Sequence, residues 1–265
     1  MNPTAIIRHY DSGQLWPTAP SNGESFGMEA AYQLTLAVRG LRIGRGEAPR
    51  GFKIGFTNRN IWERYGVFGP IWGTVYDSTL SFCDGEDAFA LKGVCQPRIE
   101  PEVVFGMGKT PPANASLEDL FDSLEWVAPG FEIVQSHLPD WKFKAPDTVA
   151  DGGLHARLVV GKQVKVRAIA SCATELHSLL ANARVNLVKG GQVLETGSGV
   201  NVLDGPMLAL QHFLRELRAC PGAPGLLPGD VITTGTWTDA WPVSPGEKWK
   251  AEFASPLSWL QVEFT

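Results

Sequence analysis

Glycine and proline interrupt this chain along most of its length, and their spacing limits the structures it can form. The 265 residues include 29 glycines and 19 prolines, which fall between short apolar runs. Short apolar segments bounded by turn residues are typical of β-strands. The pattern predicts an α+β protein with many turns and a β-rich body over residues 51–265.

Residues 1–50 are expected to form a smaller helical N-terminal region. Apolar residues recur there at three- and four-residue spacing, as on one face of a helix: Met28, Ala31, Leu34, Val38 and Leu41. Arg39, Arg42 and Arg45 lie three residues apart, which is typical of a solvated helix face, although an anion site is the alternative.

Further along, turn and cap residues predict individual elements. Strands are expected in GFKIGFT, GPIWGTVYD, WVAPGFEIVQS and LHARLVVG. A hairpin is expected around Lys189-Gly190-Gly191. Ser116 and Asp119 suit a capping box, and Asp204 with Pro206 suits the start of a long helix.

Composition narrows the function classes. The net charge of −5 gives no reason to expect nucleic acid or an anionic membrane as a partner. The sequence has neither a long apolar span nor a signal-peptide pattern. Four scattered cysteines without a CxxC pair favour a reduced, cytoplasmic protein without structural zinc. Nucleotide-binding glycine motifs are also missing.

The stretch RIEPEVVF, residues 98–105, places two carboxylates inside an apolar run. Side chains alternate across a strand, so Glu100 and Glu102 share one face. If that face is wet, they are surface residues; if it is covered, they need a positive partner, because burying unpaired charge is costly. Glu132, in VAPGFEIVQS, is a third such carboxylate. Together the three suit a hard divalent cation such as Mg²⁺ or Mn²⁺.

Three further residues allow a structural or a catalytic interpretation. Lys53 is either a strand lysine that reaches water or a charge held near a substrate carboxylate or enolate. Asp77, at a strand end, is either a turn residue or a general base. His155 follows two glycines that permit close approach of a ligand, which favours a role in proton transfer. The alternative is that His155 is a structural residue. His137 and His177 are expected at the surface.

Two threonine- and serine-rich segments also have polar groups. TTGTWT, residues 233–238, offers donors at a strand end that suit a carboxylate, which makes Thr234, Gly235 and Thr236 candidate substrate-binding residues. The segment GSGVN lacks the GxSxG pattern of a nucleophile elbow, so a serine hydrolase is not expected.

Several of these stretches resemble one protein group. GFKIGFT, IEPEVVFGMGK, GFEIVQS, VADGGLHARLVVG, VLETGSGVNVLDGPMLAL and LLPGDVITTGTWTDAWPVSPGE are similar, in order and spacing, to the 2-keto-4-pentenoate hydratase and 4-oxalocrotonate decarboxylase group of the fumarylacetoacetate hydrolase superfamily. The resemblance runs from about residue 28 to the end of the chain. It implies a rolled, partly barrel-like sheet and a homo-oligomer.

The resemblance also implies roles. Glu100, Glu102 and Glu132 fall on the group's Mg²⁺ or Mn²⁺ ligands, Lys53 on its motif lysine and Asp77 on its active-site acidic residue. The chain departs from the group at Gly152–His155, where an Asn-Ala-Ser-Ser run is expected, and at Gln135, where Asp is expected. The segment NIWERYGVFGPIW carries more aromatic bulk than usual. These departures fall in the expected substrate pocket.

The expected reaction is hydration of a small 2-oxo or 2-hydroxy-dienoic acid through a metal-stabilised enolate. Lys53 would add positive charge, Asp77 would act as the base, and His155 would transfer protons. The same site would also suit decarboxylation of a 2-oxo-enedioate. Two further alternatives are hydrolysis of a carbon–carbon bond and a metal-free binding protein. The hydrolysis needs a His–Glu pair, which His9 does not supply.

Overall fold

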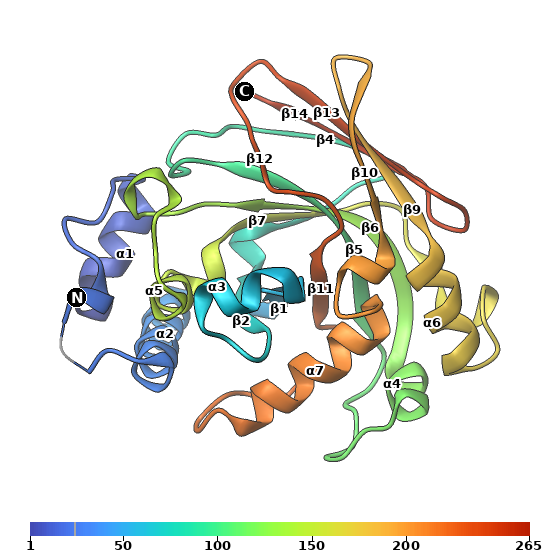
Figure 1. Ribbon diagram of the computed structural model, residues 1–265, viewed down its shortest axis with the longest axis horizontal. Coiled ribbons are helices and arrows are strands. Elements are labelled where there is room, and N and C mark those ends of the chain that lie inside the picture. The colour runs from blue at the N-terminus through green and yellow to red at the C-terminus, as the bar shows by residue number, and fades with distance from the viewer. Residues whose placement is uncertain (24) are drawn as a thin grey trace.

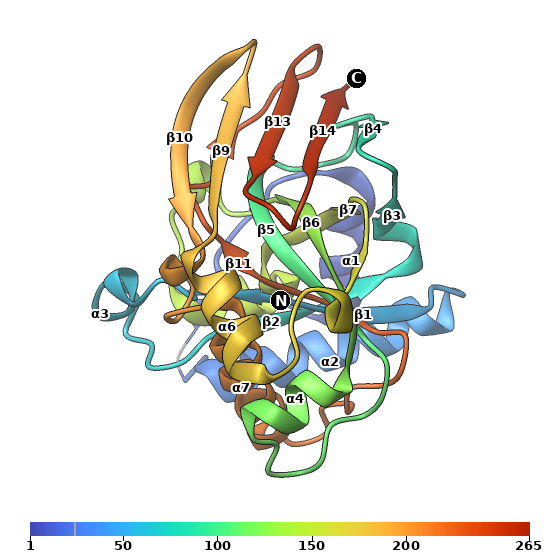
Figure 2. The same cartoon turned by 90° about the vertical axis from the view of Figure 1, so that its right-hand side faces the viewer.

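A large curled sheet forms the centre of the molecule, and a smaller sheet stands against one end of it (Figures 1 and 2). The structure is a computed structural model that describes residues 1–23 and 25–265. Within these residues the large sheet has nine strands: β1 (Pro49–Gly55), β2 (Ile71–Tyr76), β3 (Leu80–Phe82), β5 (Arg98–Met107), β6 (Leu124–Val134), β7 (His155–Val160), β8 (Val164–Lys165), β11 (Val231–Thr236) and β12 (Trp241–Pro242).

The order of the large sheet is β2-β1-β11-β5-β6-β7-β3, with β12 paired to β5 and β8 to β6. The sheet curls so far that its edge strand β2 also contacts β7. Gly73 of β2 allows close contact with the turn just before β7, because a Cβ there would lie 1.9 Å from the carbonyl oxygen of Gly152. The α+β (mixed α/β) class predicted from the sequence and the rolled sheet implied by the resemblance are confirmed.

The smaller sheet is built mainly from the second half of the chain. Its order is β10-β9-β13-β14-β4, and its strands are β4 (Glu86–Phe89), β9 (Arg184–Lys189), β10 (Gln192–Ser198), β13 (Lys248–Phe253) and β14 (Trp259–Phe264). The predicted hairpin is β9–β10, which turns at Gly190 and Gly191 with φ of 56° and 81°. Positive φ at both turn positions is what a tight hairpin with right-handed strand twist requires.

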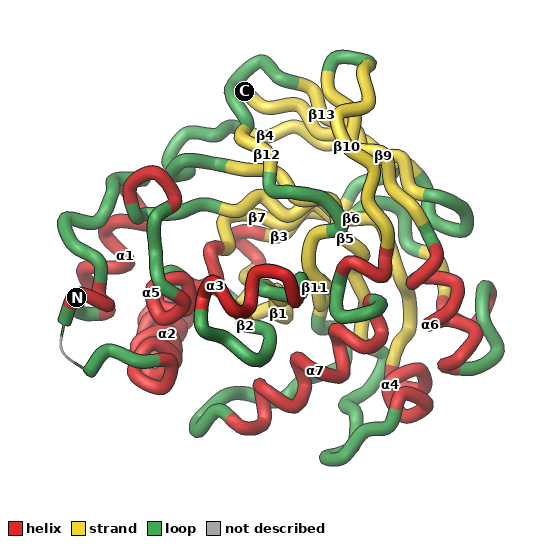
Figure 3. The backbone as a smooth tube through the Cα atoms, in the orientation of Figure 1, coloured by secondary structure: helices red, strands yellow, loops and turns green. Residues whose placement is uncertain are grey.

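Helices gather beside and below the large sheet (Figure 3). One group lies at the N-terminal side: α1 (Pro3–Ser12), α2 (Met28–Gly44) and α5 (Ala145–Ala150). A second group comprises α4 (Leu117–Ser123), α6 (Ala173–Asn182) and α7 (Pro206–Ala219), with α7 against β2 and β11. The short helix α3 (Trp62–Tyr65) follows β1. No helix among the described residues is both long and apolar enough to cross a membrane.

Most local predictions agree with these elements, and two do not. The capping box at Ser116 and Asp119 is confirmed at the start of α4. Asp204, however, does not cap α7: the cap residue is Gly205, and Asp204 pairs with Arg59 instead. The arginines of α2 are not simply solvated, because Arg42 is largely buried, binds Glu47 and lies 3.8 Å above the Tyr76 ring. The division of the chain at residue 50 stays a prediction.

The packing of the core explains the covered carboxylate face of β5. Both faces of this strand are buried beyond its first residues. Fully buried large side chains fill the space between the sheets and the helices, among them Trp72, Trp237, Trp249, Phe105 and Phe131. The Glu100–Glu102 face is therefore enclosed, and its charges need partners within the protein or a bound ion.

Candidate metal and substrate site

Three carboxylates converge where β5 pairs with β6. Glu100 and Glu132 are directly opposite each other in the antiparallel register, and Glu102 follows on the same face of β5. One carboxylate oxygen from each residue lies within 4.8 Å of the others. Glu102 and Glu132 are fully buried, whereas Glu100 is partly exposed. The alternation of side chains on two neighbouring strands is enough to bring them together.

Lys53 supplies the positive charge beside this cluster. Its Nζ lies 3.2 Å from Glu132 Oε2 and donates a hydrogen bond of 2.8 Å to the Gly153 carbonyl oxygen. Burial alone would lower the pKa of Lys53, but Glu132, Glu100 and Glu102 outweigh it and raise the pKa above its ordinary value. The lysine therefore stays protonated at neutral pH and does not reach bulk water, so the snorkelling alternative does not describe it.

The carboxylates themselves repel one another. Burial raises the pKa of Glu102 well above its usual range, and the charges of Glu132 and Glu100 add to the rise. Burial likewise raises the pKa of Glu100 to about 7. Burial favours the neutral acid at Glu132 too, but Lys53 and His155 outweigh it and lower that pKa. One ammonium group therefore does not offset the three carboxylates.

His155 supports Glu132 from outside the cluster. Its Nδ1 lies 2.9 Å from Glu132 Oε1, and its Nε2 lies 2.9 Å from the Thr79 hydroxyl. Burial lowers the pKa of His155, and Glu132 only partly offsets this. A neutral imidazole next to an ionised Glu132 carries its proton on Nδ1, so the ring fixes the orientation of that carboxylate.

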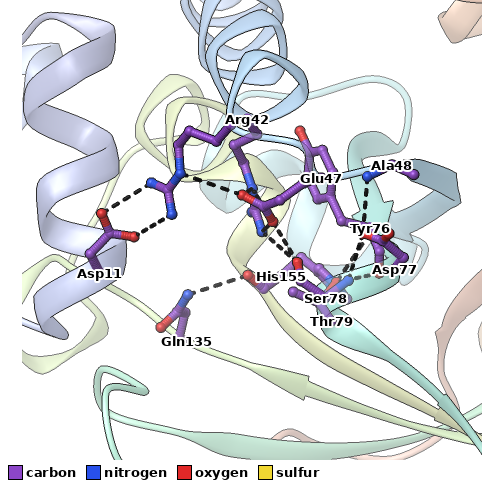
Figure 4. A network of polar contacts seen from close by, with 11 residues as sticks. Asp11, Arg42, Glu47, Ala48, Tyr76, Asp77, Ser78, Thr79, Gln135 and His155 are labelled. Carbon is purple, nitrogen blue, oxygen red and sulfur yellow. Dashed lines mark hydrogen bonds and ion pairs between the residues drawn. The ribbon is translucent and has the colours of Figure 1, made fainter.

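Asp77 lies in the polar network of Figure 4, which also includes Thr79 and His155. Its Oδ1 accepts hydrogen bonds from the backbone of Ala48 at 3.0 Å and Ser78 at 2.9 Å, and the residue is exposed. These contacts match the turn-residue alternative. The structure does not bring Asp77 to the three carboxylates, because it is not among the residues that line the cavity in front of them.

The residues of β11 that were predicted to bind a substrate carboxylate make different contacts. The Gly235 amide donates a 2.7 Å hydrogen bond to Glu102 Oε2, at a point where the β11–β5 register shifts. Gly235 has a φ of +93°, and a Cβ there would lie 2.0 Å from the Thr57 hydroxyl. The Thr234 hydroxyl points to the Val103 carbonyl oxygen and is buried. Gly235 and Thr236 line the cavity.

A cavity of about 520 Å³ opens in front of the cluster. Lys53, Glu100 and Gly153 lie on its lining. Its lining also includes aromatic residues from segments far apart in the sequence, namely Phe56, Tyr65, Trp141 and Phe143. Apart from the aromatic-rich stretch around Tyr65, sequence patterns did not indicate these residues, because loops without periodicity bring them together.

His137 was also misjudged from the sequence. It is fully buried, and its Nδ1 lies 2.7 Å from Asp151 Oδ1. The Asp151 carboxylate also accepts the His137 backbone amide at 2.9 Å, and Tyr10 and Trp16 contact the ring. This pair anchors the loop after β6 and lies outside the cavity lining.

The donor set fits a hard divalent cation. Glu102 Oε1 is buried and has no hydrogen-bond partner among the described residues, and such an oxygen is costly unless a donor or a cation faces it. Three carboxylate oxygens are what Mg²⁺ or Mn²⁺ takes from protein, with the remaining positions open to water or substrate. The residues therefore fit a divalent metal ion.

Solved structures share this architecture. A 4-oxalocrotonate decarboxylase from Pseudomonas putida G7, complexed with magnesium and adipate, matches with a TM-score of 0.88 and 22% identity over 99% of this chain and 95% of that one. A fumarylpyruvate hydrolase from Pseudomonas aeruginosa, in complex with Mn²⁺ and pyruvate, matches with a TM-score of 0.61 and 15% identity over 82% and 90% of the two chains. At these identities the likeness shows the fold.

Sequence comparison adds the family. A 2-hydroxyhexa-2,4-dienoate hydratase from Comamonas testosteroni is 36% identical over 83% of this chain and 80% of its own. A 2-hydroxypent-2,4-dienoate hydratase from Pseudomonas putida is 31% identical over 71% and 81%. A 4-oxalocrotonate decarboxylase from a Pseudomonas species is also 31% identical, over 77% and 75%. No family model matches the sequence.

The fold is the one found in proteins of the fumarylacetoacetate hydrolase family. Within that superfamily the chain belongs to the group of 2-keto-4-pentenoate hydratases and 4-oxalocrotonate decarboxylases, and it is a lyase.

Proposed function

We propose that this chain hydrates a 2-hydroxy-dienoic acid, with Mg²⁺ or Mn²⁺ held by Glu100, Glu102 and Glu132. The convergence of three carboxylates within 4.8 Å beside a buried lysine carries the proposal. The hydratases related to this chain support the choice of substrate class. A bound divalent cation would supply positive charge for the carboxylate and C2 oxygen of a 2-oxo acid.

The protein's own groups would orient and polarise the substrate. Lys53 Nζ, on the cavity lining, offers an N–H and a full positive charge to the substrate's C2 oxygen. Gly153 fixes the direction of that ammonium through its carbonyl oxygen. Gly235 holds Glu102 in place, and His155 holds Glu132. Gly235 and His155 are therefore positioning residues in this proposal, and they do not act on the substrate directly.

The reaction redistributes the atoms of one water and the enol. The hydroxyl of water joins C4, and the two remaining hydrogens, one from water and one from the enol, end on C3 and C5. The chain offers protonated Lys53 at the substrate, and the open cavity admits water. In this proposal Asp77 has no part at the reacting atoms, because its carboxylate bonds to Ala48 and Ser78.

Decarboxylation of a 2-oxo-enedioate is the second candidate. One relative is a decarboxylase, and the guanidinium of Arg98 lines the cavity on the same β5 face as Glu100. Arg98 is the group that the second carboxylate of such a substrate would have to meet.

Ultraviolet decay of a small panel of 2-hydroxy-dienoates and 2-oxo-enedioates, with and without Mg²⁺, tests the proposal. Product mass separates gain of water from loss of CO₂. We expect metal-dependent gain of water. Loss of CO₂ alone would favour the second candidate, and turnover that persists in chelator would contradict the metal site.

A further inference from the structure

Four aromatic side chains form a continuous surface in the outer part of the cavity, here called the aromatic wall: Phe56, Tyr65, Phe143 and Trp141. The Phe56 and Tyr65 ring centroids are 5.1 Å apart at 20°, and those of Tyr65 and Phe143 are 5.8 Å apart at 28°. Trp141 follows at 6.1 Å from Phe143. All four side chains are half-buried. The wall therefore offers an unbroken apolar surface to whatever fills the cavity.

Two members of the wall lie on strained backbone. Phe56 has a φ of 56° and Trp141 a φ of 57°, a region that bulky residues rarely adopt. Each is fixed by a tryptophan indole: Trp62 Nε1 donates to the Phe56 carbonyl oxygen at 2.7 Å, and Trp141 Nε1 donates to the Gln96 carbonyl oxygen at 3.0 Å. Strain of this kind concentrates where a protein positions groups for a ligand.

Charge in the outer cavity disfavours a second carboxylate on the substrate. Arg98 lies 4.3 Å above the Trp141 ring and donates a long 3.5 Å bond to the Ala240 carbonyl oxygen. Its charge also acts on Glu100 beside it. Glu195 and Asp239 line the same region. Among the described residues that line this part of the cavity, two carboxylates face one guanidinium, so a distal anion there would meet net repulsion.

The cavity is larger than a five- or six-carbon acid needs. A space of about 150 Å³ is enough to hold benzene, whereas this cavity measures about 520 Å³. A five- or six-carbon acid at the metal end would leave the aromatic wall facing water, which is unfavourable for apolar surface.

From these observations we infer that the preferred substrate carries an uncharged apolar group of about the size of a benzene ring beyond C4, seated against the aromatic wall. The inference rests on the proposed function, since it places the 2-oxo acid end at the three carboxylates. It makes Phe56, Tyr65, Trp141 and Phe143 the residues that determine specificity.

Binding of unreactive 2-oxo acids tests this inference separately from turnover. Isothermal titration with Mg²⁺ present would compare 2-oxo-5-phenylpentanoate, 2-oxohexanoate and 2-oxohexanedioate, which share the chelating end and differ at the far end. We expect the phenyl compound to bind about tenfold more tightly than 2-oxohexanoate, and the diacid to bind most weakly.

Variants assign the preference to the wall. In Phe143→Ala the advantage of the phenyl compound over 2-oxohexanoate should shrink about tenfold, and Phe143→Leu, which retains apolar volume, should show the same direction if the alanine variant folds poorly. Phe68→Ala is the matched control, because Phe68 is 90% exposed and lies outside the cavity lining. It should leave the preference unchanged.

The possible outcomes separate the two claims. Equal affinities for 2-oxo-5-phenylpentanoate and 2-oxohexanoate would overturn the inference while leaving the proposed hydration intact. Tightest binding of 2-oxohexanedioate would do the same. Failure of all three acids to bind with Mg²⁺ would overturn the proposed function and the inference together. Tight phenyl binding without hydration of any dienoate would support the inference and overturn only the reaction.

Discussion

At the residue scale, the protein holds more negative charge at one point than its own groups offset. Glu102 shows this most clearly: it is fully buried, it takes one hydrogen bond from Gly235, and its other oxygen has no donor among the described residues. Burying a carboxylate in this way is costly without a cation. The cost indicates a binding site rather than a structural ion pair.

Glu102→Gln tests this directly. The amide keeps an acceptor for the Gly235 N–H but loses the charge, so we expect Mg²⁺ affinity to fall about 100-fold or more and metal-dependent turnover to be lost. The metal-free variant should be at least as stable as the parent, because mutual repulsion is reduced. Titration calorimetry and thermal unfolding measure both effects.

Glu125→Gln serves as the control, since Glu125 is an exposed residue on β6, the strand that also holds Glu132. It should bind Mg²⁺ as the parent does. Unchanged Mg²⁺ affinity in Glu102→Gln would refute the assignment of this ligand.

The titration of Glu100 predicts how the site responds to pH. Its pKa is raised to about 7 from an ordinary value of 4.5. A carboxyl group whose folded-state pKa is raised stabilises the fold while protonated and loses that contribution as pH rises through the folded value. The metal-free protein should therefore lose thermal stability between pH 4.5 and about 7.

Thermal unfolding in chelator across that range gives the measurement, with Glu100→Gln as the comparison. The variant cannot lose a proton at this position, so its decline with pH should be shallower. Parallel curves for the two proteins would show that Glu100 does not titrate as described.

At the element scale, close backbone approaches place the site. β2 reaches the glycine turn at residues 152–154 only because Gly73 has no side chain, and that turn directs the Gly153 carbonyl oxygen to Lys53. The bulge at Gly235 in β11 turns an amide toward Glu102 in the same manner. Neither contact can form if a Cβ occupies the space.

Gly73→Ala should therefore disturb Lys53 from a distance. The added methyl would meet the Gly152 carbonyl at 1.9 Å, so we expect a loss of roughly 1–3 kcal/mol in the free energy of unfolding and a fall in turnover. Gly40→Ala, at an open position inside helix α2 with nothing within 4 Å, should instead be neutral or stabilising by roughly 0.5–1 kcal/mol.

Chemical denaturation with parallel activity assays distinguishes the two variants. If Gly73→Ala kept full stability and turnover, the approach of β2 to the glycine turn would not control the position of Lys53.

At the scale of the whole molecule, folding and metal binding are expected to be linked. An ion that binds only the folded state stabilises it by mass action, by about 2.7 kcal/mol when its concentration is 100 times the dissociation constant. Mg²⁺ at pH 7.5 should therefore raise the unfolding temperature of the parent and not that of Glu102→Gln. An equal rise in both would point to binding elsewhere.

The single chain buries four of its nine tryptophans, Trp16, Trp72, Trp237 and Trp249, whereas Trp259 is 43% exposed. The tryptophan content therefore gives no argument for or against assembly. The homo-oligomer and the cytoplasmic location expected from the sequence stay predictions.

The sequence by itself determined the local chemistry of this protein. Alternation along one strand was sufficient to place Glu100 and Glu102 on one face, and a glycine pair and capping residues set the β9–β10 hairpin and the start of α4. These features depend on residues close together in the chain, so periodicity and turn preferences report them.

Only the tertiary structure decided what each charge meets. It enclosed the β5 face, set His155 against Glu132, removed Asp77 from the cavity lining and buried His137 with Asp151. It also assembled the aromatic wall from segments nearly ninety residues apart, between Phe56 and Phe143. Burial and long-range contact depend on how the sheet curls and which loops cover it, and no local pattern in the chain encodes that.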